Sequence, residues 1–339
     1  SLIDENGGRR VRMGQLAFVG SHSINGVSGL HTELMKQTVF SDLHKLYPER
    51  INNKTNGITP RRWLMQCNPE LTQLISDTIG SEFLDNIDLL RGLEPYADNA
   101  DFQAQFAAVK HGNKQKLAKL IRDRLDIVVS PDAMFDVQIK RIHEYKRQLL
   151  NIIQTIALYN EIRAHPERDW VPRVKIFAGK AAPSYWNAKL IIKLINDVAK
   201  VINNDPAVRG LLKVVFLPNY NVSLAEIIVP AADLSEQIST AGMEASGTGN
   251  MKFMANGAIT IGTMDGANVE MHKEVGNENI VIFGLTTGEV DSVRNSGEPP
   301  RNYIEASPRL NEALQSIASG VFSPDDPNRY RDLMGGLYD

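Results

Sequence analysis

The chain has 339 residues, of which 42% are hydrophobic and 23% charged, as expected for a globular protein of two or three domains at roughly 100 to 200 residues each. Its formal net charge of -3 excludes a global attraction to nucleic acid or to an anionic membrane. Cys67 is the only cysteine, which excludes an internal disulfide or a cysteine-rich zinc site and favours a reducing, cytoplasmic setting.

The N-terminal segment SLIDENGGRRVR lacks the apolar core of a signal peptide, and no later run approaches the roughly 20 apolar residues of a membrane span. We therefore expect a soluble chain. It opens on serine rather than methionine and soon becomes apolar, so we interpret it as a piece of a longer polypeptide.

Amphipathic spacing predicts helices over residues 29–45 and 101–125. The turn-rich segment NNKTNGITPRR, residues 52–62, interrupts this helical part. We place a domain boundary there, with residues 1–56 as the end of one domain and residues 57–339 as a second domain.

Short, β-rich apolar runs predict strands at residues 135–139, 174–178, 213–217, 258–263 and 280–283. Between them, residues 144–163 and 188–201 have helical period. This alternation predicts a parallel α/β sheet that is covered on both faces, with ligands beyond the carboxyl ends of its strands. Residues 295–302 (NSGEPPRN) have the composition of a surface loop.

The first cluster with chemical potential is KRIHEYKR, residues 140–147, directly after a predicted strand. Its local net charge is +3, from Lys140, Arg141, Lys146 and Arg147 against Glu144. A basic cluster between a strand end and a helix start favours a phosphate. The alternative is a solvated charged face on the following helix.

The second cluster is STAGMEASGTGNMKFMANG, residues 239–257. Gly247, Thr248 and Gly249 precede a short helical stretch that Gly257 can end, and Lys252 lies one turn beyond Thr248. An apolar setting lowers the pKa of a lysine and makes its amine nucleophilic, which suits pyridoxal phosphate. The alternative is an ordinary glycine-rich turn; the Walker A order is absent.

Longer segments carry a family resemblance. EASGTGNMKFMANGAITIGTMDGANVEM (residues 244–271) resembles the pyridoxal phosphate segment of the α-glucan phosphorylases, and KRIHEYKRQLLN (residues 140–151) resembles their phosphate-binding segment. GSHSINGV, NKTNGITPRRW, GKAAPSYWNAK and PAADLSEQISTAG are also similar to family segments, in family order. The resemblance covers essentially the whole chain. It implies a GT-B type fold: part of one domain, then a Rossmann-like sheet domain that is incomplete at its C-terminus.

The resemblance also implies roles for single residues. Lys252 would carry pyridoxal phosphate covalently, Thr248, Gly249 and Lys140 would hold its phosphate, and Trp63 and Tyr220 would pack near it. Arg141 and Lys146 would bind the substrate phosphate, whereas His22, Asn56, Glu244 and Gly247 would contact the transferred glucosyl unit. Without the motif context, each of three residues has an ordinary structural explanation. His22 would be a histidine of the core or of a turn, Trp63 would serve packing, and Asn56 would belong to a turn. No metal is expected.

The implied reaction is phosphorolysis of terminal α-1,4-linked glucose from glycogen, starch or maltodextrin, with retention and with the cofactor's 5'-phosphate as proton relay. The residues fit this reaction. Glycoside cleavage normally needs two carboxylates, but Glu244 shows no evident carboxylate partner in the sequence. In phosphorolysis, phosphate can take the roles of both carboxylates.

Inorganic phosphate, the glucan and glucose 1-phosphate are the implied partners, and full-length members are expected to be homodimers. Family members are much longer, so we expect at most a trace of activity from the isolated chain. Asn221 follows Tyr220 where animal members carry arginine, which resembles the plant or bacterial pattern. The alternatives are an inactive phosphate-binding fragment and a nucleotide-sugar glycosyltransferase, which shares the architecture but has no need of Lys252.

Overall fold

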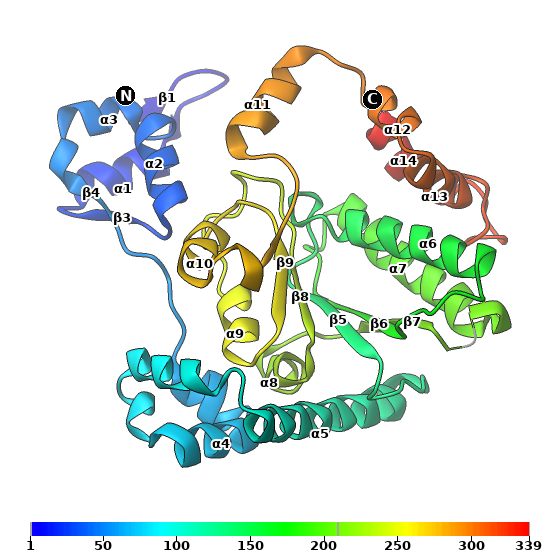
Figure 1. Ribbon diagram of the computed structural model, residues 1–339. Coiled ribbons are helices and arrows are strands. Elements are labelled where there is room, and N and C mark those ends of the chain that lie inside the picture. Colours follow the sequence, from blue (N-terminus) through cyan, green and yellow to red (C-terminus); the bar gives the residue numbers. More distant parts are fainter. Residues whose placement is uncertain (1, 209, 339) are drawn as a thin grey trace.

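The computed structural model describes residues 2–208 and 210–338, and its centre is a six-stranded parallel sheet (Figure 1). The strands are β5 (Met134–Ile139), β6 (Arg173–Ala178), β7 (Leu212–Leu217), β8 (Leu234–Gln237), β9 (Ile259–Gly262) and β10 (Val281–Ile282). Most residues of β5, β6 and β7 are apolar and buried, as expected where helices cover both faces of a parallel sheet.

The strand order is β10-β9-β8-β5-β6-β7, so the order reverses between β5 and β8. The chain builds outward from β5 through β6 and β7, and then returns to build outward on the other side. This is the doubly wound order of Rossmann-like sheets, in which a crevice opens at the reversal, beyond the carboxyl ends of the strands. The predicted parallel α/β fold is confirmed, and the reversal fixes where a ligand site belongs.

Five of the six strands coincide with predicted runs, within one or two residues at each end. The sixth, β8, has the sequence LSEQ and was not predicted, because its polar side chains hide the apolar signal of a buried strand. Ser235, Glu236 and Gln237 are nevertheless buried, since neighbouring polar groups satisfy them.

One face of the sheet is covered by α6 (Gln148–Ala164) and α7 (Trp186–Asn204), and the C-terminal helices α12 (Pro300–Glu305), α13 (Pro308–Ala318) and α14 (Arg331–Tyr338) pack onto them. Their apolar side chains form one continuous core with residues of β6 and β7. The predicted helix over residues 188–201 is confirmed and is longer than expected.

The opposite face is covered by α5 (Ala100–Leu125), α8 (Val222–Ala231) and α9 (Gly249–Ala255), which share a second core with β5, β6 and β7. The predicted helix over residues 101–125 is confirmed. A π-helical turn (Arg61–Gln66) and α4 (Pro69–Ile79) pack beside α5 and α9 in a smaller third cluster. In Figure 1, α4 and α5 form the lowest layer of the molecule.

The N-terminal part contains β1 (Ile3–Asp4), β2 (Arg10–Val11), α1 (Met13–Gly20), β3 (Ile24–Gly26), α2 (Gly29–Gln37), α3 (Ser41–Leu46) and β4 (Ile51–Asn53). An extended segment after Asn53 leads from this part to the π-helical turn (Figure 1). The domain boundary after residue 56 stays a prediction.

Two helix predictions and one loop prediction needed correction. The helix predicted over residues 29–45 is two helices, because Thr38 ends α2 and its hydroxyl donates back to the Leu34 carbonyl (2.7 Å). The helix predicted from residue 144 starts at Gln148, because Arg147 adopts a left-handed backbone (φ 61°). The loop predicted at residues 295–302 is shorter, since α11 (Thr287–Ser296) runs up to Gly297 and α12 starts at Pro300.

Helix α10 (Asn268–Val275) follows β9. Over residues 2–208 and 210–338, no helix combines the length and hydropathy that crossing a membrane requires.

Candidate functional site

The candidate site lies where the strand order reverses. Lys140 directly follows β5 and Gln237 ends β8, so both residues stand at the carboxyl ends of neighbouring parallel strands. The Lys140 Nζ donates to Gln237 Oε1 at 2.8 Å. Gly249, the first residue of α9, borders the same place, since a Cβ built on it would lie 3.8 Å from Gln237 Nε2. Segments more than 90 residues apart in sequence thus meet at one point.

Lys140 has an unusual charge environment. Among the described residues it forms no ion pair, and its side-chain ammonium donates to a neutral amide. Burial, together with the nearby charge of Lys146, lowers the pKa of Lys140 to about 8, although Glu244, Asp265 and Glu236 oppose this change. A half-buried lysine without a carboxylate partner is a position that an anion would stabilise.

Residues 140–147, which we call the basic loop, keep their shape through contacts with the next strand. Lys140 N donates to the Ala178 carbonyl and Ile142 N donates to the Lys180 carbonyl, each at 3.1 Å. Gly179 lies between these contacts, and a Cβ there would stand 2.0 Å from the Lys140 carbonyl oxygen. Glycine is therefore required at this position for the basic loop to approach the segment after β6.

Lys146 leaves the basic loop toward Glu244, and the two side chains form an ion pair. Their side chains are only 13% and 21% exposed, so the pair is partly shielded from water. The Tyr145 hydroxyl stands 3.4 Å from both Glu244 carboxylate oxygens, and the Lys146 Nζ lies 4.6 Å from the centre of the Tyr145 ring. The structure thus brings together two predicted site residues from the two sequence clusters.

Asp265 organises the segment that carries Glu244, and the sequence analysis missed it. Its buried carboxylate accepts from the Ser239 hydroxyl (2.6 Å) and from the backbone N–H groups of Gly242 and Glu244 (both 2.9 Å). The available signal was an acidic residue just after the strand run AITIGT, at the carboxyl end of β9.

Lys252 lies on α9 with its Nζ 4.1 Å from the centre of the Trp63 ring. Burial lowers the pKa of Lys252, which increases the fraction of neutral, nucleophilic amine at a given pH. Its backbone N–H donates to the carbonyl of Thr248, which lies directly before α9. The predicted short helix between the glycine-rich turn and Gly257 (φ 78°) is confirmed.

A buried asparagine connects α9 with the π-helical turn. Asn256 Nδ2 donates to the carbonyls of Trp63 (2.7 Å) and Lys252 (2.9 Å), and its Oδ1 accepts from Asn68 Nδ2 (2.9 Å). Because Asn256 is fully buried, these bonds hold the backbone of Trp63 beside α9.

Four other predicted site residues take no part in the contacts described above. Arg141 is exposed, and so are His22 between α1 and β3 and Asn56 in the extended segment after β4. Tyr220 is half-buried and packs against the core that includes Phe253 of α9. The roles assigned to these four residues stay predictions.

The N-terminal part contacts the glycine-rich segment and the helix that follows it. The Ser28 hydroxyl donates to the Ala245 carbonyl at 2.5 Å, next to Glu244. The carboxylate of Glu270 on α10 accepts from the Gly29 backbone (3.3 Å) and from the Thr55 hydroxyl (2.5 Å). These contacts hold the N-terminal part beside the candidate site.

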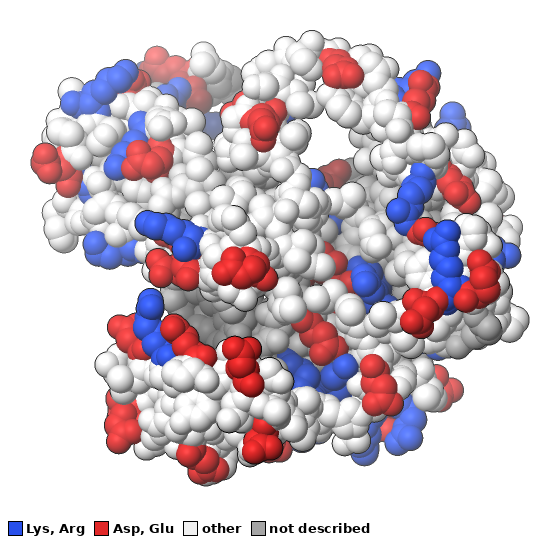
Figure 2. Space-filling view, viewed as in Figure 1, with Lys and Arg blue, Asp and Glu red and all other residues white. Residues whose placement is uncertain are grey.

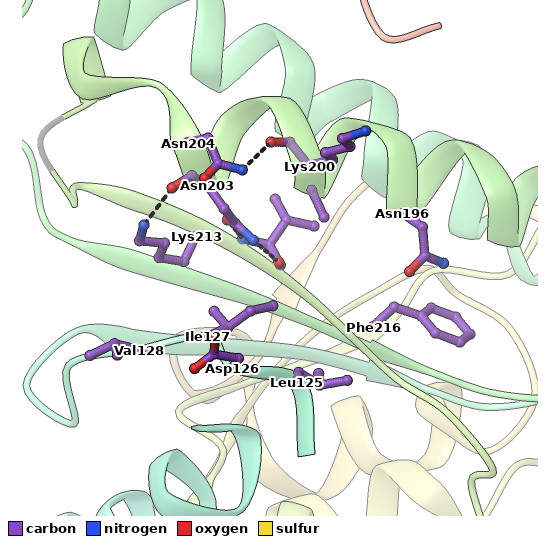
Figure 3. Close-up of a pocket in the computed structure, with 12 residues that line it drawn as sticks. Leu125, Asp126, Ile127, Val128, Asn196, Lys200, Asn203, Asn204, Lys213 and Phe216 are labelled. Carbon is purple, nitrogen blue, oxygen red and sulfur yellow. Dashed lines mark hydrogen bonds between the residues drawn. The ribbon is translucent and has the colours of Figure 1, made fainter. Parts of the chain in front are cut away.

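A cavity of about 490 Å³ lies elsewhere, between α7, edge strand β7 and the end of α5 (Figure 3). Several of its polar side chains bind backbone groups: Lys213 Nζ donates to the Asn203 carbonyl (2.8 Å), and Asn204 Nδ2 donates to the Lys200 carbonyl (2.8 Å). The Asn203 amide bonds the Val214 carbonyl (2.8 Å) and accepts from its N–H (2.9 Å). We therefore assign these groups to the closure of the sheet edge.

The molecular surface in Figure 2 carries acidic and basic side chains side by side, with no large patch of one sign on this face. The same view shows a hollow between the lowest layer and the part above it. Within the described residues, no group of three or more histidine, cysteine, aspartate or glutamate side chains is arranged to hold a metal ion.

Comparison with known proteins adds independent information. A sequence profile of the family described as carbohydrate phosphorylase matches residues 1–339. The chain is 55% identical to a glycogen phosphorylase of Synechocystis sp., 53% to one of Haemophilus influenzae and 51% to the liver form of Bos taurus. These alignments cover 99 to 100% of the chain but only 40 to 41% of each relative. The chain thus spans about two fifths of the length of the relatives it matches.

Proposed function

The chain belongs to the carbohydrate phosphorylase family, and from this premise we propose that it forms the cofactor- and phosphate-binding part of an α-glucan phosphorylase. The reaction would release terminal α-1,4-linked glucose from glycogen, starch or maltodextrin as α-glucose 1-phosphate. A phosphate oxygen bonds to C1 of the terminal glucose, the bond from C1 to the next glucose breaks, and the departing oxygen takes a proton. The anomeric configuration is retained.

The observation that carries this proposal is the pairing of Lys140 with Gln237 at the strand-order reversal. Lys140 is half-buried, bears no ion pair among the described residues and lies beside the start of α9. An anionic ligand there would provide a charge partner for Lys140, and the neighbouring Lys146 would supply a second positive charge to the ligand.

Pyridoxal phosphate fits the residues around this position. Lys252 would bind its aldehyde, because burial favours the neutral amine and the Trp63 ring shields it. Thr248, Gly249 and Lys140 would hold the cofactor phosphate, and Trp63 and Tyr220 would pack near its ring. When bound, the cofactor supplies a phosphate group that exchanges a proton with the substrate phosphate.

The substrate phosphate would be bound by Arg141 and Lys146, and the glucosyl unit by His22, Asn56, Glu244 and Gly247. The ion pair between Lys146 and Glu244 supports placing the two substrate groups side by side. Arg141 is exposed in the basic loop, where its planar guanidinium can donate two hydrogen bonds to a phosphate in bidentate geometry.

The proposal extends to the setting of the full-length protein. We expect it in the cytoplasm, in keeping with the single cysteine, and as a homodimer by analogy with the family.

The cofactor assignment is tested by reducing the chain with borohydride in the presence of pyridoxal phosphate, followed by peptide mapping. The pyridoxyl label should appear on Lys252, and Lys252→Ala should abolish it with little effect on folding. Lys200→Ala, which changes an exposed lysine on α7, is the matched control and should keep the label. Recovery of the label on another lysine would refute the assignment.

Catalysis is tested by phosphorolysis of maltodextrin by this chain beside a version extended at both ends to the length of its relatives. We expect α-glucose 1-phosphate from the extended version and at most a trace from the chain alone. In the extended version, Arg141→Ala should raise the apparent constant for phosphate and slow turnover, and Lys146→Ala should do the same more weakly. A change confined to glucan affinity would mean that the basic loop is only a solvated surface.

A further inference from the structure

A chain of buried polar side chains runs beneath the basic loop, and neither the reaction nor the core explains it. Lys175 stands in the middle of β6 and is 1% exposed, where an apolar residue is the usual choice. The sheet register places it opposite Asp136 of β5. Its three ammonium protons are all used, toward Asp136 Oδ2 (2.6 Å), Glu236 Oε1 (3.2 Å) and Asn151 Oδ1 (2.9 Å).

The chain continues from Asn151 to the basic loop. Asn151, on α6, donates from Nδ2 to Gln138 Oε1 at 3.0 Å. Gln138, on β5, donates from Nε2 to the backbone carbonyl of Lys146 at 3.0 Å. Asn151 is 3% exposed and Gln138 is 1% exposed, so water does not compete with these bonds. The chain therefore links the centre of the sheet to the residue that pairs with Glu244.

The direction of every bond in this chain is fixed by its two ends. A lysine ammonium only donates, and a backbone carbonyl only accepts. Asn151 must therefore present its oxygen to Lys175 and its amide nitrogen to Gln138. Gln138 must present its oxygen to Asn151 and its amide nitrogen to the Lys146 carbonyl. Turning either amide over would break two bonds at once and leave buried groups without partners, which is costly.

We propose that Lys175, Asn151 and Gln138 are positioning residues that hold the Lys146 carbonyl, and with it the basic loop, in the conformation that receives phosphate. The phosphate-binding part of this statement rests on the proposed function, but the conformational part does not. A second buried residue supports the same loop, since Gln148 Nε2 donates to the Arg141 carbonyl at 2.9 Å.

The variants for the test are Gln138→Met, which removes both bonds of the central amide, and Asn151→Asp, which keeps size but turns the donor into an acceptor. The matched control is Thr155→Val on α6. Thr155 is also fully buried, and its hydroxyl donates to the Asn151 carbonyl (2.8 Å) one turn away, outside the chain. Thermal unfolding of all three variants shows which are folded.

The first readout is amide hydrogen exchange of residues 141–147, which needs no ligand. It should become about tenfold faster or more in Gln138→Met and Asn151→Asp, the change that corresponds to losing one buried bond, and stay unchanged in Thr155→Val. Unchanged exchange in a folded Gln138→Met or Asn151→Asp chain would overturn the proposal. In the unmodified chain, the side-chain amide protons of Gln138 and Asn151 should exchange slowly in NMR spectra, and fast exchange would overturn it as well.

The second readout is the affinity for pyridoxal phosphate compared with pyridoxal, which lacks the phosphate. The two variants should lose about tenfold for the phosphorylated form only, whereas Thr155→Val should keep the ratio. If the unmodified chain shows no preference for the phosphorylated form, the proposed function is wrong. Hydrogen exchange then still tests whether the positioning residues hold the basic loop. If the preference exists and both variants keep it, the positioning role is wrong.

Discussion

Lys140 links the protonation state of one residue to anion binding. Its pKa of about 8 in the folded chain means that it loses its charge as the pH rises through that value. A bound phosphate stabilises the charged form and raises the pKa, so the ligand-free state releases the proton first. We predict that the affinity for 4-deoxypyridoxine 5'-phosphate, which has no aldehyde to react with Lys252, falls as the pH rises above about 8.

Isothermal titration calorimetry between about pH 7 and 9.5 measures this dependence, which can reach at most about tenfold per pH unit for one proton. Lys140→Met should bind more weakly at pH 7 and show no loss above pH 8. The same pH dependence in Lys140→Met would assign the proton to another group.

Gly179 makes a second prediction at the scale of one residue. Gly179→Ala places a Cβ where the Lys140 carbonyl oxygen and the Ile142 side chain already stand, at 2.0 and 2.8 Å. The nearest obstacle is backbone, so the basic loop must move, and we expect a loss of about 1 to 3 kcal/mol in the free energy of unfolding. Urea unfolding measures it.

The matched control is Gly112→Ala within α5, where a Cβ meets nothing within 4 Å. This change should stabilise the chain by up to about 1 kcal/mol, since alanine is the better helix former. If Gly179→Ala behaves like the control, the close contact between the loop and the segment after β6 is wrong.

At the scale of elements, Asn256 determines how α9 meets the π-helical turn. Asn256→Ala would leave the buried Asn68 amide and the Trp63 carbonyl without this partner. We predict a loss of roughly 2 to 4 kcal/mol in the free energy of unfolding, together with a change in Trp63 fluorescence. Asn204→Ala is the control because Asn204 is exposed and makes one bond within α7; it should cost less than about 0.5 kcal/mol. Equal losses for both variants would contradict the prediction.

The sequence predicted most elements because their patterns are local. The strands β5, β6, β7, β9 and β10 are β-rich apolar runs, and α9 lies between a glycine-rich turn and Gly257. Strand β8 was not predicted, because Glu236 and Gln237 are residue types typical of the surface. In the fold they are buried with Lys175 and Lys140 as their partners. Such partners come from other strands, and no local pattern contains them.

In the candidate site, too, the sequence predicted residues within local clusters but not the contacts between distant segments. Lys252, Lys140, Lys146 and Glu244 were predicted within their clusters, and the structure brings Lys146 and Glu244 together. The sequence could not show that Lys140 pairs with Gln237 or that Asp265 holds the Glu244 segment, because both contacts depend on the strand order of the folded sheet.

At the scale of the whole molecule, one buried acid makes stability depend on pH. Burial raises the pKa of Glu236 from 4.5 to about 7, with Asp136 adding to the shift and Lys175 opposing it. Between these two pH values the folded chain holds a proton that the unfolded chain has released. The contribution of Glu236 to the free energy of unfolding therefore falls as the pH rises from about 4.5 to about 7.

Glu236→Gln isolates this contribution, because glutamine keeps the acceptor for Lys175 and does not titrate. The difference in free energy of unfolding between the variant and the parent, from urea unfolding at several pH values, should shift in favour of the variant by up to about 1.4 kcal/mol per pH unit in this window. A difference that does not change with pH would show that Glu236 ionises normally.

Asn203 affects how copies of the chain behave toward one another. Strand β7 is an edge of the sheet, and a free edge can recruit a strand from a second molecule and start aggregation. The Asn203 amide already satisfies both the N–H and the carbonyl of Val214, as a neighbouring strand would. A side chain from the preceding helix thus occupies the backbone groups of Val214 that a strand from a second molecule would need in order to extend the sheet.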